Sequence, residues 1–565
     1  MNKILIAYSL LDKTDKSKLF LIFLMILLTM FLEMIGIGLI IPLINLLIDS
    51  ENYYIIQNIN FFENSSQNEI IKFFSFILIF LYLLKACFVF IFNKFKYGYL
   101  FDLQKKISSE FMGKYLSFDY SKILKTSSSE KIRNLNNVSI FVELLNQSLM
   151  LITEFFLIIG IGLIVLWIND IGSIFIFIII GIVSYYLFRV SKKSLYIYGK
   201  ERNKFDKLKF QSIQENFFSI KEIKILKKEK FFTHKFSKIN NFYADFSKKF
   251  EIYQIIPKVT LEFIGILSLC SVIIYMVLRG IDTKIIIINM GIFAAAAFKM
   301  IPSLGRIINH TQFISYYSNI VEIFESQSDF QTNDKLDIVG NKISFNKNII
   351  FKNIFFSFGE KKILENFNLE IEKYECIGLI GESGVGKSTL INLLLGLLSP
   401  DKGKILIDGV DTDFKEYYWG ETIGYVPQFI YLINDTIKKN IAFGIENELI
   451  DEHSIKSSIK NSQLEKFIED TNGGIEYIID ENGKNLSGGQ IQRIGIARAL
   501  YNNPKILILD ESTSSLDKDT EESFLNIIKN LKNTLTIIII SHKQNPLSIC
   551  DKIYKISDKR VEIMQ

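Results

Sequence analysis

Cysteine is scarce in this chain, and neither sign of charge is in large excess. The 565 residues include four cysteines, which are Cys87, Cys270, Cys376 and Cys550. Their wide spacing excludes the closely spaced pattern of a metal site, so we expect reduced, space-filling side chains. The 65 Lys and Arg residues against 60 Asp and Glu residues give a net charge of +5, which gives no reason to expect a nucleic-acid partner.

Apolar residues, by contrast, are abundant and unevenly spread. They make up 49% of the chain, and the mean hydropathy is +0.25, which together indicate a membrane protein with a soluble part. Six runs of membrane-spanning length lie at 19–48, 70–93, 146–168, 171–193, 252–279 and 285–308. We therefore expect an α-helical transmembrane domain over residues 1–320, a polar linker over 321–345 and a soluble domain over 346–565.

Basic residues beside the apolar runs indicate the orientation in a membrane. Three lysines at residues 13–18 precede the first run, whereas residues 49–69 contain acids and no Lys or Arg. Because Lys and Arg accumulate on the cytoplasmic side, residues 49–69 should face outward. The segments 94–143 and 194–251 are rich in Lys and keep helical patterning, so we expect them to project into the cytoplasm with the soluble domain.

A glycine-rich turn lies between a predicted strand and a predicted helix in the soluble domain. The apolar run 376–380 indicates a buried strand, and residues 389–398 continue like a helix. The turn consists of Gly381, Glu382, Ser383, Gly384, Val385, Gly386, Lys387, Ser388 and Thr389. Its backbone N–H groups and the helix N-terminus can surround an anion. Lys387 would supply a charge for the β- and γ-phosphates of ATP, and the Ser388 hydroxyl would bind Mg²⁺.

Two later apolar runs deliver polar groups at their carboxyl ends. The run 506–509 has the continuous apolar character of a strand buried on both faces, and Asp510 and Glu511 follow it. We expect Asp510 to hold Mg²⁺ through water and Glu511 to polarise the attacking water. The run 537–540 leads to His542, whose imidazole could contact the γ-phosphate, although a structural role is the alternative.

With these motifs the chain resembles the ATP-binding cassette (ABC) family over nearly its whole length. The resemblance implies that Phe358 stacks on adenine and that Gln428, in the run 425–428, senses Mg²⁺ and contacts the membrane domain. It also implies that residues 514–517 communicate between two ATP sites. The sequence departs from the family pattern in having Phe rather than Tyr at 358, and Lys543-Gln544 rather than Arg-Leu after His542. Neither departure removes a catalytic group.

The family resemblance also implies a partner. The signature segment 486–490 includes Ser487, Gly488, Gly489 and Gln490. In the family this segment covers the γ-phosphate held by the opposite subunit. One cassette therefore cannot complete a site, and a homodimer is the simplest arrangement for a chain with a single cassette. The expected protein is a six-span exporter of the bacterial cytoplasmic (inner) membrane, with a cytoplasmic α/β P-loop cassette that uses ATP and Mg²⁺.

Two short segments in the lysine-rich regions have a candidate mechanical role. Residues 117–120 and 216–219 look like the coupling helices through which cassettes of this family act on the membrane domain. Ordinary turns within a long helical pair are the alternative.

Basic residues inside the apolar runs are the only indication of the substrate. The candidates are Lys85, Lys258, Lys299 and Arg306. Charges within a membrane are costly and usually face a cavity or a partner, so in a dimer these residues predict an anion-binding vestibule. In the alternative interpretation, Lys258 pairs with Glu262, Arg306 extends to the interface, and Glu33 and Glu154 neutralise the others.

The sequence around these basic residues resembles one subgroup of the family. The run 298–303 with Arg306, together with 257–258 and 261–262, looks like the flippases that turn over lipid-linked oligosaccharides for protein glycosylation. Lysine stands at three basic positions where arginine is expected, and it lacks the bidentate fork for phosphate, so a related anionic lipid also fits. The runner-up is an exporter of peptides or drug-like amphiphiles. A membrane-tethered cassette ATPase of another class is disfavoured by the six apolar runs.

Overall fold

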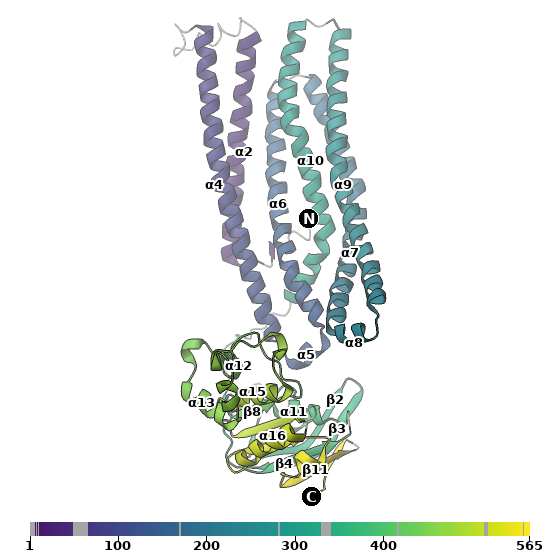
Figure 1. Ribbon diagram of the computed structural model, residues 1–565. Coiled ribbons are helices and arrows are strands. Elements are labelled where there is room, and N and C mark those ends of the chain that lie inside the picture. Colours follow the sequence, from purple (N-terminus) through teal and green to yellow (C-terminus); the bar gives the residue numbers. More distant parts are fainter. Residues whose placement is uncertain are drawn as a thin grey trace. The chain divides into compact units, whose positions relative to one another are not determined.

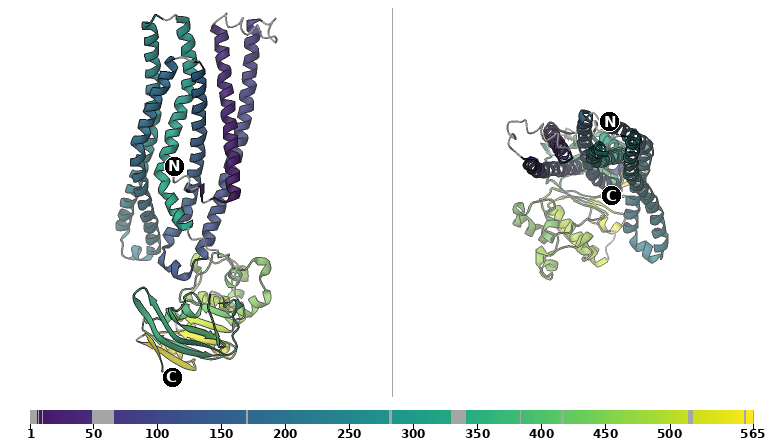
Figure 2. Two further views of the ribbon diagram at one scale, coloured as in Figure 1. Left: turned by 180° about the vertical axis from the view of Figure 1, so that it is seen from behind. Right: turned by 90° about the horizontal axis from the view of Figure 1, so that it is seen from above.

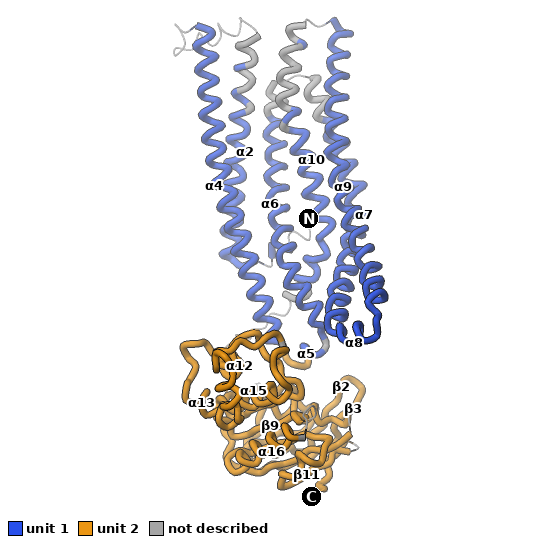
Figure 3. Tube along the Cα trace, viewed as in Figure 1, with its two compact units in different colours: residues 1–118, 123–334 blue, residues 119–122, 335–565 orange. Residues whose placement is uncertain are grey.

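The computed structural model describes residues 11–48, 66–168, 171–280, 283–328, 341–382, 384–414, 417–513, 518–557 and 559–564, together with Ile6, Tyr8 and Ser9. The chain divides into two compact units, which Figure 3 shows in different colours. The first comprises Met1–Phe118 and Ile123–Asp334, and the second comprises Asp119–Lys122 and Lys335–Gln565.

Long helices build the first unit, as the apolar runs predict. Within the described residues they are α2 (Lys13–Ile48), α4 (Gln67–Leu116), α6 (Ser128–Ile168), α7 (Ile171–Phe218), α9 (Glu229–Leu278) and α10 (Thr283–Ser328) (Figure 1). In the part of the chain that is described, α2, α4, α6 and α9 contain stretches long and apolar enough to cross a membrane. Most of these helices continue well past their apolar run into polar sequence. Figure 2 shows α2 and α4 side by side along their length.

The end of α10 corrects the expected linker. Residues 321–328 are helical, and Val321 and Phe324 are buried whereas Glu322 and Glu325 are exposed. The Phe324 ring stacks on Phe141 of α6, with the ring centroids 4.6 Å apart. An amphipathic stripe therefore lies within sequence whose polar composition had indicated a linker.

A close contact joins α7 to α10. A Cβ atom added at Gly199 of α7 would lie 1.7 Å from the backbone oxygen of Tyr316 in α10. The Tyr316 ring is buried and stacks on Phe250 of α9, with the centroids 4.2 Å apart. Glycine is therefore required where these helices meet.

Short helices lie at or next to the two short segments singled out in the sequence. Helix α5 (Tyr120–Lys125) overlaps the end of the segment 117–120, and α8 (Ile220–Ile225) follows the segment 216–219. A helix of six residues thus begins at the last residue of the first segment and directly after the second, whose residues 216–218 end α7.

A six-stranded sheet forms the centre of the second unit. Its order is β12 (Arg560–Ile563), β11 (Lys552–Ser557), β4 (Cys376–Gly381), β10 (Thr536–Ile540), β9 (Ile506–Asp510) and β8 (Ile423–Val426). All neighbours are parallel except β11 and β12. Strands β9 and β10 are apolar and almost completely buried, as is typical of parallel strands covered on both faces.

An antiparallel sheet and several helices complete this unit. The sheet has the order β3 (Lys361–Glu372), β2 (Asn348–Phe358), β5 (Lys402–Ile407) and β6 (Val410–Asp411). The helices are α11 (Lys387–Leu394), α12 (Ile437–Ile441), α13 (Glu452–Asn461), α14 (Glu465–Glu469), α15 (Gly488–Leu500), α16 (Lys518–Leu531) and α17 (Gln544–Leu547). Strand β1 (Asn341–Lys342) pairs with β7 (Tyr417–Tyr418), and Ile343 and Phe345 are buried. Residues 341–345 therefore belong to the cassette and not to the linker.

Candidate functional site

The register of the parallel sheet brings three loops to one edge. Ile540 at the end of β10 is level with Asp510 on β9 and with Leu379 on β4. The loops that follow β4, β9 and β10 are therefore neighbours. The Glu511 N–H donates a hydrogen bond to the Ile540 carbonyl at 3.0 Å, which ties two of these loops together.

The loop after β4 has the backbone geometry of an anion-binding turn. Gly384 and Gly386 adopt φ values of 86° and 113°, which side chains disfavour. A Cβ atom added at Gly386 would also lie 2.9 Å from the Ile363 side chain. Helix α11 begins at Lys387, two residues earlier than the sequence pattern predicted, so its N-terminus opens directly onto the loop. Ser383 lies outside the described residues.

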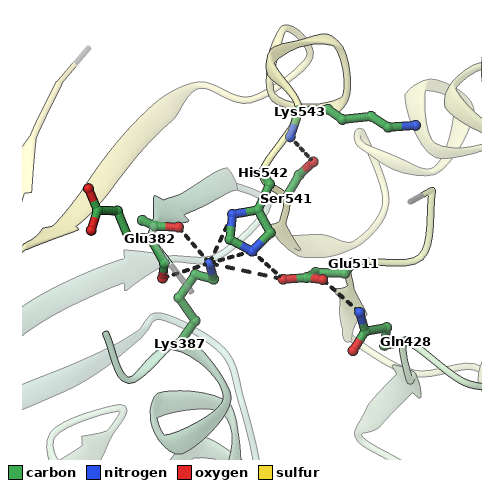
Figure 4. Close-up of polar contacts among 8 residues, drawn as sticks. Glu382, Lys387, Gln428, Glu511, Ser541, His542 and Lys543 are labelled. Atoms are coloured by element: carbon green, nitrogen blue, oxygen red, sulfur yellow. Dashed lines mark hydrogen bonds and ion pairs between the residues drawn. The ribbon is translucent and has the colours of Figure 1, made fainter. Parts of the chain in front are cut away.

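The Lys387 ammonium lies at the centre of a polar network (Figure 4). It donates hydrogen bonds to the backbone oxygen of Gly381 at 2.6 Å and of Glu382 at 3.3 Å. It also lies 2.9 Å from His542 Nε2 and 4.0 Å from Glu511 Oε1. Burial lowers the pKa of Lys387, and the nearby carboxylate of Glu511 opposes that effect.

Both carboxylate oxygens of Glu511 are held in place (Figure 4). His542 Nε2 lies 2.8 Å from Oε1, and Gln428 Nε2 donates to Oε2 at 2.7 Å. Glu511 itself has a φ of 47°, an uncommon conformation for a residue other than glycine. The structure thus brings together Lys387, Gln428, Glu511 and His542, the groups that the sequence assigned to phosphate binding and hydrolysis.

Asp510 has a neighbour that the sequence analysis missed. The Tyr425 hydroxyl donates a hydrogen bond to Asp510 Oδ2 at 3.2 Å. Burial raises the pKa of Asp510, and this hydrogen bond opposes the rise. Tyr425 was noted only as part of the segment containing Gln428. The pairing of β8 with β9, in which Tyr425 is opposite Ile508, could have indicated its proximity to Asp510.

The available oxygen donors fit Mg²⁺ rather than a metal held entirely by protein. Within the described residues, no group of three or more His, Cys, Asp or Glu side chains could hold a metal ion. The oxygen donors that the sequence assigned to this ion are the hydroxyl of Ser388, the carboxylate of Asp510 and the amide of Gln428. Mg²⁺ favours such sparse oxygen sites, because it keeps several waters and shares nucleotide phosphates.

Phe358 and Ser487 lie at the outer parts of the cassette. Phe358 ends β2, is 45% exposed and contacts Phe356 edge to face, so part of its ring is open to solvent. Ser487 caps α15, where its hydroxyl accepts a hydrogen bond from the Gln490 N–H at 3.3 Å. The Gln490 side chain accepts one from the Ser487 N–H at 2.8 Å, which completes a capping box. Residues 514–517 lie outside the described part of the chain.

Lys543, at the position where the family usually has arginine, uses its positive charge to contact two neighbouring groups. Its ammonium donates to the backbone oxygen of Thr513 at 3.1 Å and lies 3.5 Å from the carboxylate of Glu521, which is buried. Lys543 therefore connects the loops after β9 and β10 to α16.

The basic residues of the first unit have mixed environments. Lys85 forms an ion pair with Glu33, and Arg306 pairs with Glu154 through Nε–Oε1 and Nη2–Oε2 distances of 2.5 and 3.0 Å. The Lys85–Glu33 pair agrees with the alternative interpretation of the vestibule, in which Glu33 neutralises a cation. The Arg306–Glu154 pair differs from it, because that interpretation had Arg306 extending to the interface. Lys258 and Arg306 line one cavity of about 790 Å³ between α9 and α10. The Lys299 side chain lies outside the described part.

Comparison with known families agrees with both units. Residues 19–297 match the family described as ABC transporter transmembrane region, and residues 364–514 match the family described as ABC transporter. The chain therefore belongs to the ABC transporters and fuses a transmembrane region to an ATP-binding domain. A bacterial Atm1-family ABC exporter solved with ATP bound shares its fold, with a TM-score of 0.78 and 20% identity, over 97% of this chain and 95% of that chain. The arrangement is that of the exporter type.

Curated relatives are similar over shorter stretches. A Rickettsia typhi protein provisionally named export ATP-binding/permease protein is 35% identical over 360 residues, covering 58% of this chain and 59% of the relative. An ATP-dependent lipid A-core flippase of Francisella novicida is 32% identical over 262 residues, covering 46% and 43%. The flippase of the same name from Pasteurella multocida is 37% identical over 215 residues, covering 38% and 37%. The chain thus spans about half the length of these relatives.

Replacing Tyr425 by Phe should alter the titration of Asp510. Without the phenol hydroxyl, the pKa of Asp510 should rise further, so less carboxylate is present at a given pH. The acidic limb of the pH profile of ATPase activity should move to higher pH, and more Mg²⁺ should be needed for half-maximal activity. The exposed Tyr431, replaced by Phe, is the matched control. A Tyr425→Phe profile identical to that of the parent would contradict this role.

Replacing Glu511 by Gln should leave nucleotide binding intact but slow ATP turnover at least about a hundredfold, because the water loses the carboxylate that positions and polarises it. The hydrolysis rate and a nucleotide-binding titration measure the two effects separately. Glu469→Gln, at an exposed position of the cassette, controls for loss of charge. An activity within a few-fold of the parent would eliminate the assigned role of Glu511.

Proposed function

We propose that this chain is an ATP-driven exporter that functions as a homodimer in the bacterial cytoplasmic membrane, with its cassette in the cytoplasm. We further propose six membrane spans per subunit, and an anionic lipid such as a lipid-linked oligosaccharide as the substrate, moved from the inner to the outer leaflet. The observation that carries the proposal is the network of Lys387, His542, Glu511 and Gln428 in a chain that also has membrane-length apolar helices.

The network supports a division of labour in hydrolysis. Bound ATP and Mg²⁺ would supply the transferable phosphoryl group and the cation that balances its charge. Lys387 and the N–H groups of the glycine-rich turn bind phosphate oxygens. Glu511, held by His542 and Gln428, orients and polarises the water, and His542 is close enough to Lys387 to reach the same phosphate.

Two features support a second copy of the chain as partner. Helix α15, which follows Ser487, contacts β8, whereas the phosphate loop follows β4. The sheet order places β9 and β10 between these strands, so β8 and β4 are roughly 14 Å apart at ordinary strand spacing. The chain's own signature segment therefore lies too far from its phosphate loop to cover it. A signature segment from another cassette would cover the loop instead.

The second feature is an exposed apolar surface around α8. Phe217, Phe218 and Ile225 are 73%, 81% and 78% exposed. Large apolar side chains grouped in this way are typical of surfaces that a partner covers. A cassette of the second copy is a suitable partner for α8, in the coupling role that the sequence predicts.

The cavity between α9 and α10 supports an amphiphilic substrate. Lys258, Glu262 and Arg306 line one end, and apolar residues such as Ile266 and Phe298 line the other. Because α9 and α10 are consecutive and antiparallel, residues near 258 and 306 are at one level and residues near 266 and 298 at another. A polar headgroup and an apolar tail fit such a cavity. The lipid A-core flippases among the relatives favour a lipid over peptides, which are the second candidate.

Mixing two inactive variants should restore ATPase activity, because the signature segment of one subunit acts on the ATP site of the other. Ser487→Arg and Lys387→Ala dimers should each lack ATPase activity, whereas a mixed dimer contains one site with both elements intact. Measuring ATPase activity after subunit exchange, with exchange verified by crosslinking, tests the homodimer. No recovery in crosslinked mixed dimers would reject the arrangement in which each signature serves the opposite site.

Lys258 offers a cleaner test of substrate binding than Arg306, because removing Arg306 would leave the buried Glu154 without its partner. Lys258 is exposed to the cavity, and one lost charge-assisted hydrogen bond costs roughly 1.5–3 kcal/mol. Lys258→Gln should therefore lower transport of a labelled lipid-linked sugar in vesicles more than tenfold at limiting substrate.

Two further variants complete this test. Gly305→Leu should fill the cavity and lower transport similarly, because a Cβ at Gly305 meets nothing within 4 Å and the fold should tolerate it. Lys248→Gln, at an exposed position on α9, is the charge control. Parental transport by both cavity variants would reject the cavity as the substrate site, and uptake of peptides instead of lipid would favour the second candidate.

A further inference from the structure

A second cavity lies where the apolar runs of α2 and α4 begin and end. Lys18 immediately precedes the run 19–48, and Lys94 immediately follows the run 70–93. The helices lie side by side, and the Lys18 ammonium lies 5.9 Å from the centre of the Tyr99 ring of α4. A cavity of about 430 Å³ opens here, at the lysine-rich end of two membrane-length helices.

The charges of this cavity have a definite order. Its lining includes Ile91, Lys94, Gly98 and Asp102 of α4, together with Lys18 of α2. Within the described residues, neither lysine takes part in an ion pair. Residues 94, 98 and 102 are one helical turn apart and share a face, so they lie at successive levels along α4. Apolar, cationic and acidic groups therefore follow one another away from the apolar run.

We propose that this cavity binds a phospholipid whose headgroup carries a primary ammonium, that is, phosphatidylethanolamine. Lys18 and Lys94 bind the phosphate, Asp102 accepts hydrogen bonds from the ammonium, and the acyl chains lie along Ile91 and the neighbouring apolar surface. Two lysines at the boundary of apolar helices match a phosphate. A lipid with a second phosphate beyond the diester would place it against Asp102.

The proposal concerns a lipid bound in this cavity beside α2 and α4, and it does not depend on the transported substrate. Ile91 is 57% exposed and Phe95 is 37% exposed. A free phosphate ion would leave this apolar surface uncovered. The occupant that covers it and also pairs both kinds of charge is a lipid.

Gly98 provides a variant that fills the cavity without disturbing the protein. A Cβ atom at this position meets nothing within 4 Å, and leucine is a better helix former than glycine. Gly98→Leu should therefore fold at least as well as the parent and exclude the lipid headgroup.

The experiment measures lipids retained by the full-length protein. The protein is purified in detergent, stripped of lipid, and mixed with equal amounts of phosphatidylethanolamine, phosphatidylglycerol and phosphatidylcholine. Native mass spectrometry then counts bound molecules of each lipid. Preferential retention of phosphatidylethanolamine by roughly tenfold is expected, which corresponds to one charge-assisted hydrogen bond.

Variants assign the preference to the residues named. Lys18→Gln with Lys94→Gln, and separately Gly98→Leu, should abolish the retained molecule. Asp102→Asn should keep one phospholipid bound but lose the preference for the ethanolamine headgroup. Lys192→Gln with Lys193→Gln, near the end of the run 171–193, is the matched control and should bind like the parent.

Several outcomes would overturn the proposal. Equal retention of the three lipids by the parent would remove the role of Asp102. Undiminished binding in both Gly98→Leu and the Lys18, Lys94 variant would remove the cavity as the site. Binding of free inorganic phosphate that competes fully with the lipid would show that the acyl chains contribute nothing.

Discussion

The parallel pairing of β4, β10 and β9 is the constraint on which the candidate ATP site depends. Their shared register places the ends of three strands at one edge, so residues as far apart as Lys387 and His542 come within hydrogen-bonding distance. The strands are buried on both faces and tolerate little but apolar side chains. Polar groups can therefore appear only where each strand ends, and this is where Asp510 and Glu511 lie.

In the helical unit, the main constraint is that buried carboxylates must be paired with cations. Glu33 and Glu154 are both buried, and each is paired with a cation from a different helix. A buried carboxylate without a partner would be costly, so these pairs also fix which faces of the helices meet. Arg306 lines the α9–α10 cavity, but its pairing with Glu154 offsets its charge. The cavity is therefore less positive than the basic residues in the sequence alone suggested. Lys258, which lines the same cavity, is exposed.

Local sequence patterns predicted the elements that depend on continuous apolar burial. The strands at 376–381 and 506–510 and the apolar part of each long helix were evident because burial alone selects their residues. Helix ends were less evident, since α10 continues through polar sequence on the strength of Val321 and Phe324. Contacts between distant segments could not be read from local patterns.

Side-chain partners show the same limit. The apolar runs that end at Glu511 and His542 placed both residues near the nucleotide. They did not show that Gln428 holds one carboxylate oxygen of Glu511 while His542 holds the other. Tyr425 escaped notice because its hydroxyl acts on Asp510 across two strands. The pairing of Lys85 with Glu33 was left open between two interpretations, because it depends on how α2 and α4 face each other.

The contact of Gly199 with the Tyr316 backbone has a consequence for how such a protein can diversify. Even alanine there would separate α7 from α10, so this position allows almost no variation. The cavity walls farther along α10 carry no comparable restriction, and Gly305 even leaves open space beside it. Related proteins could therefore differ in their transported molecule by changing the cavity-lining residues while keeping the same contact between α7 and α10.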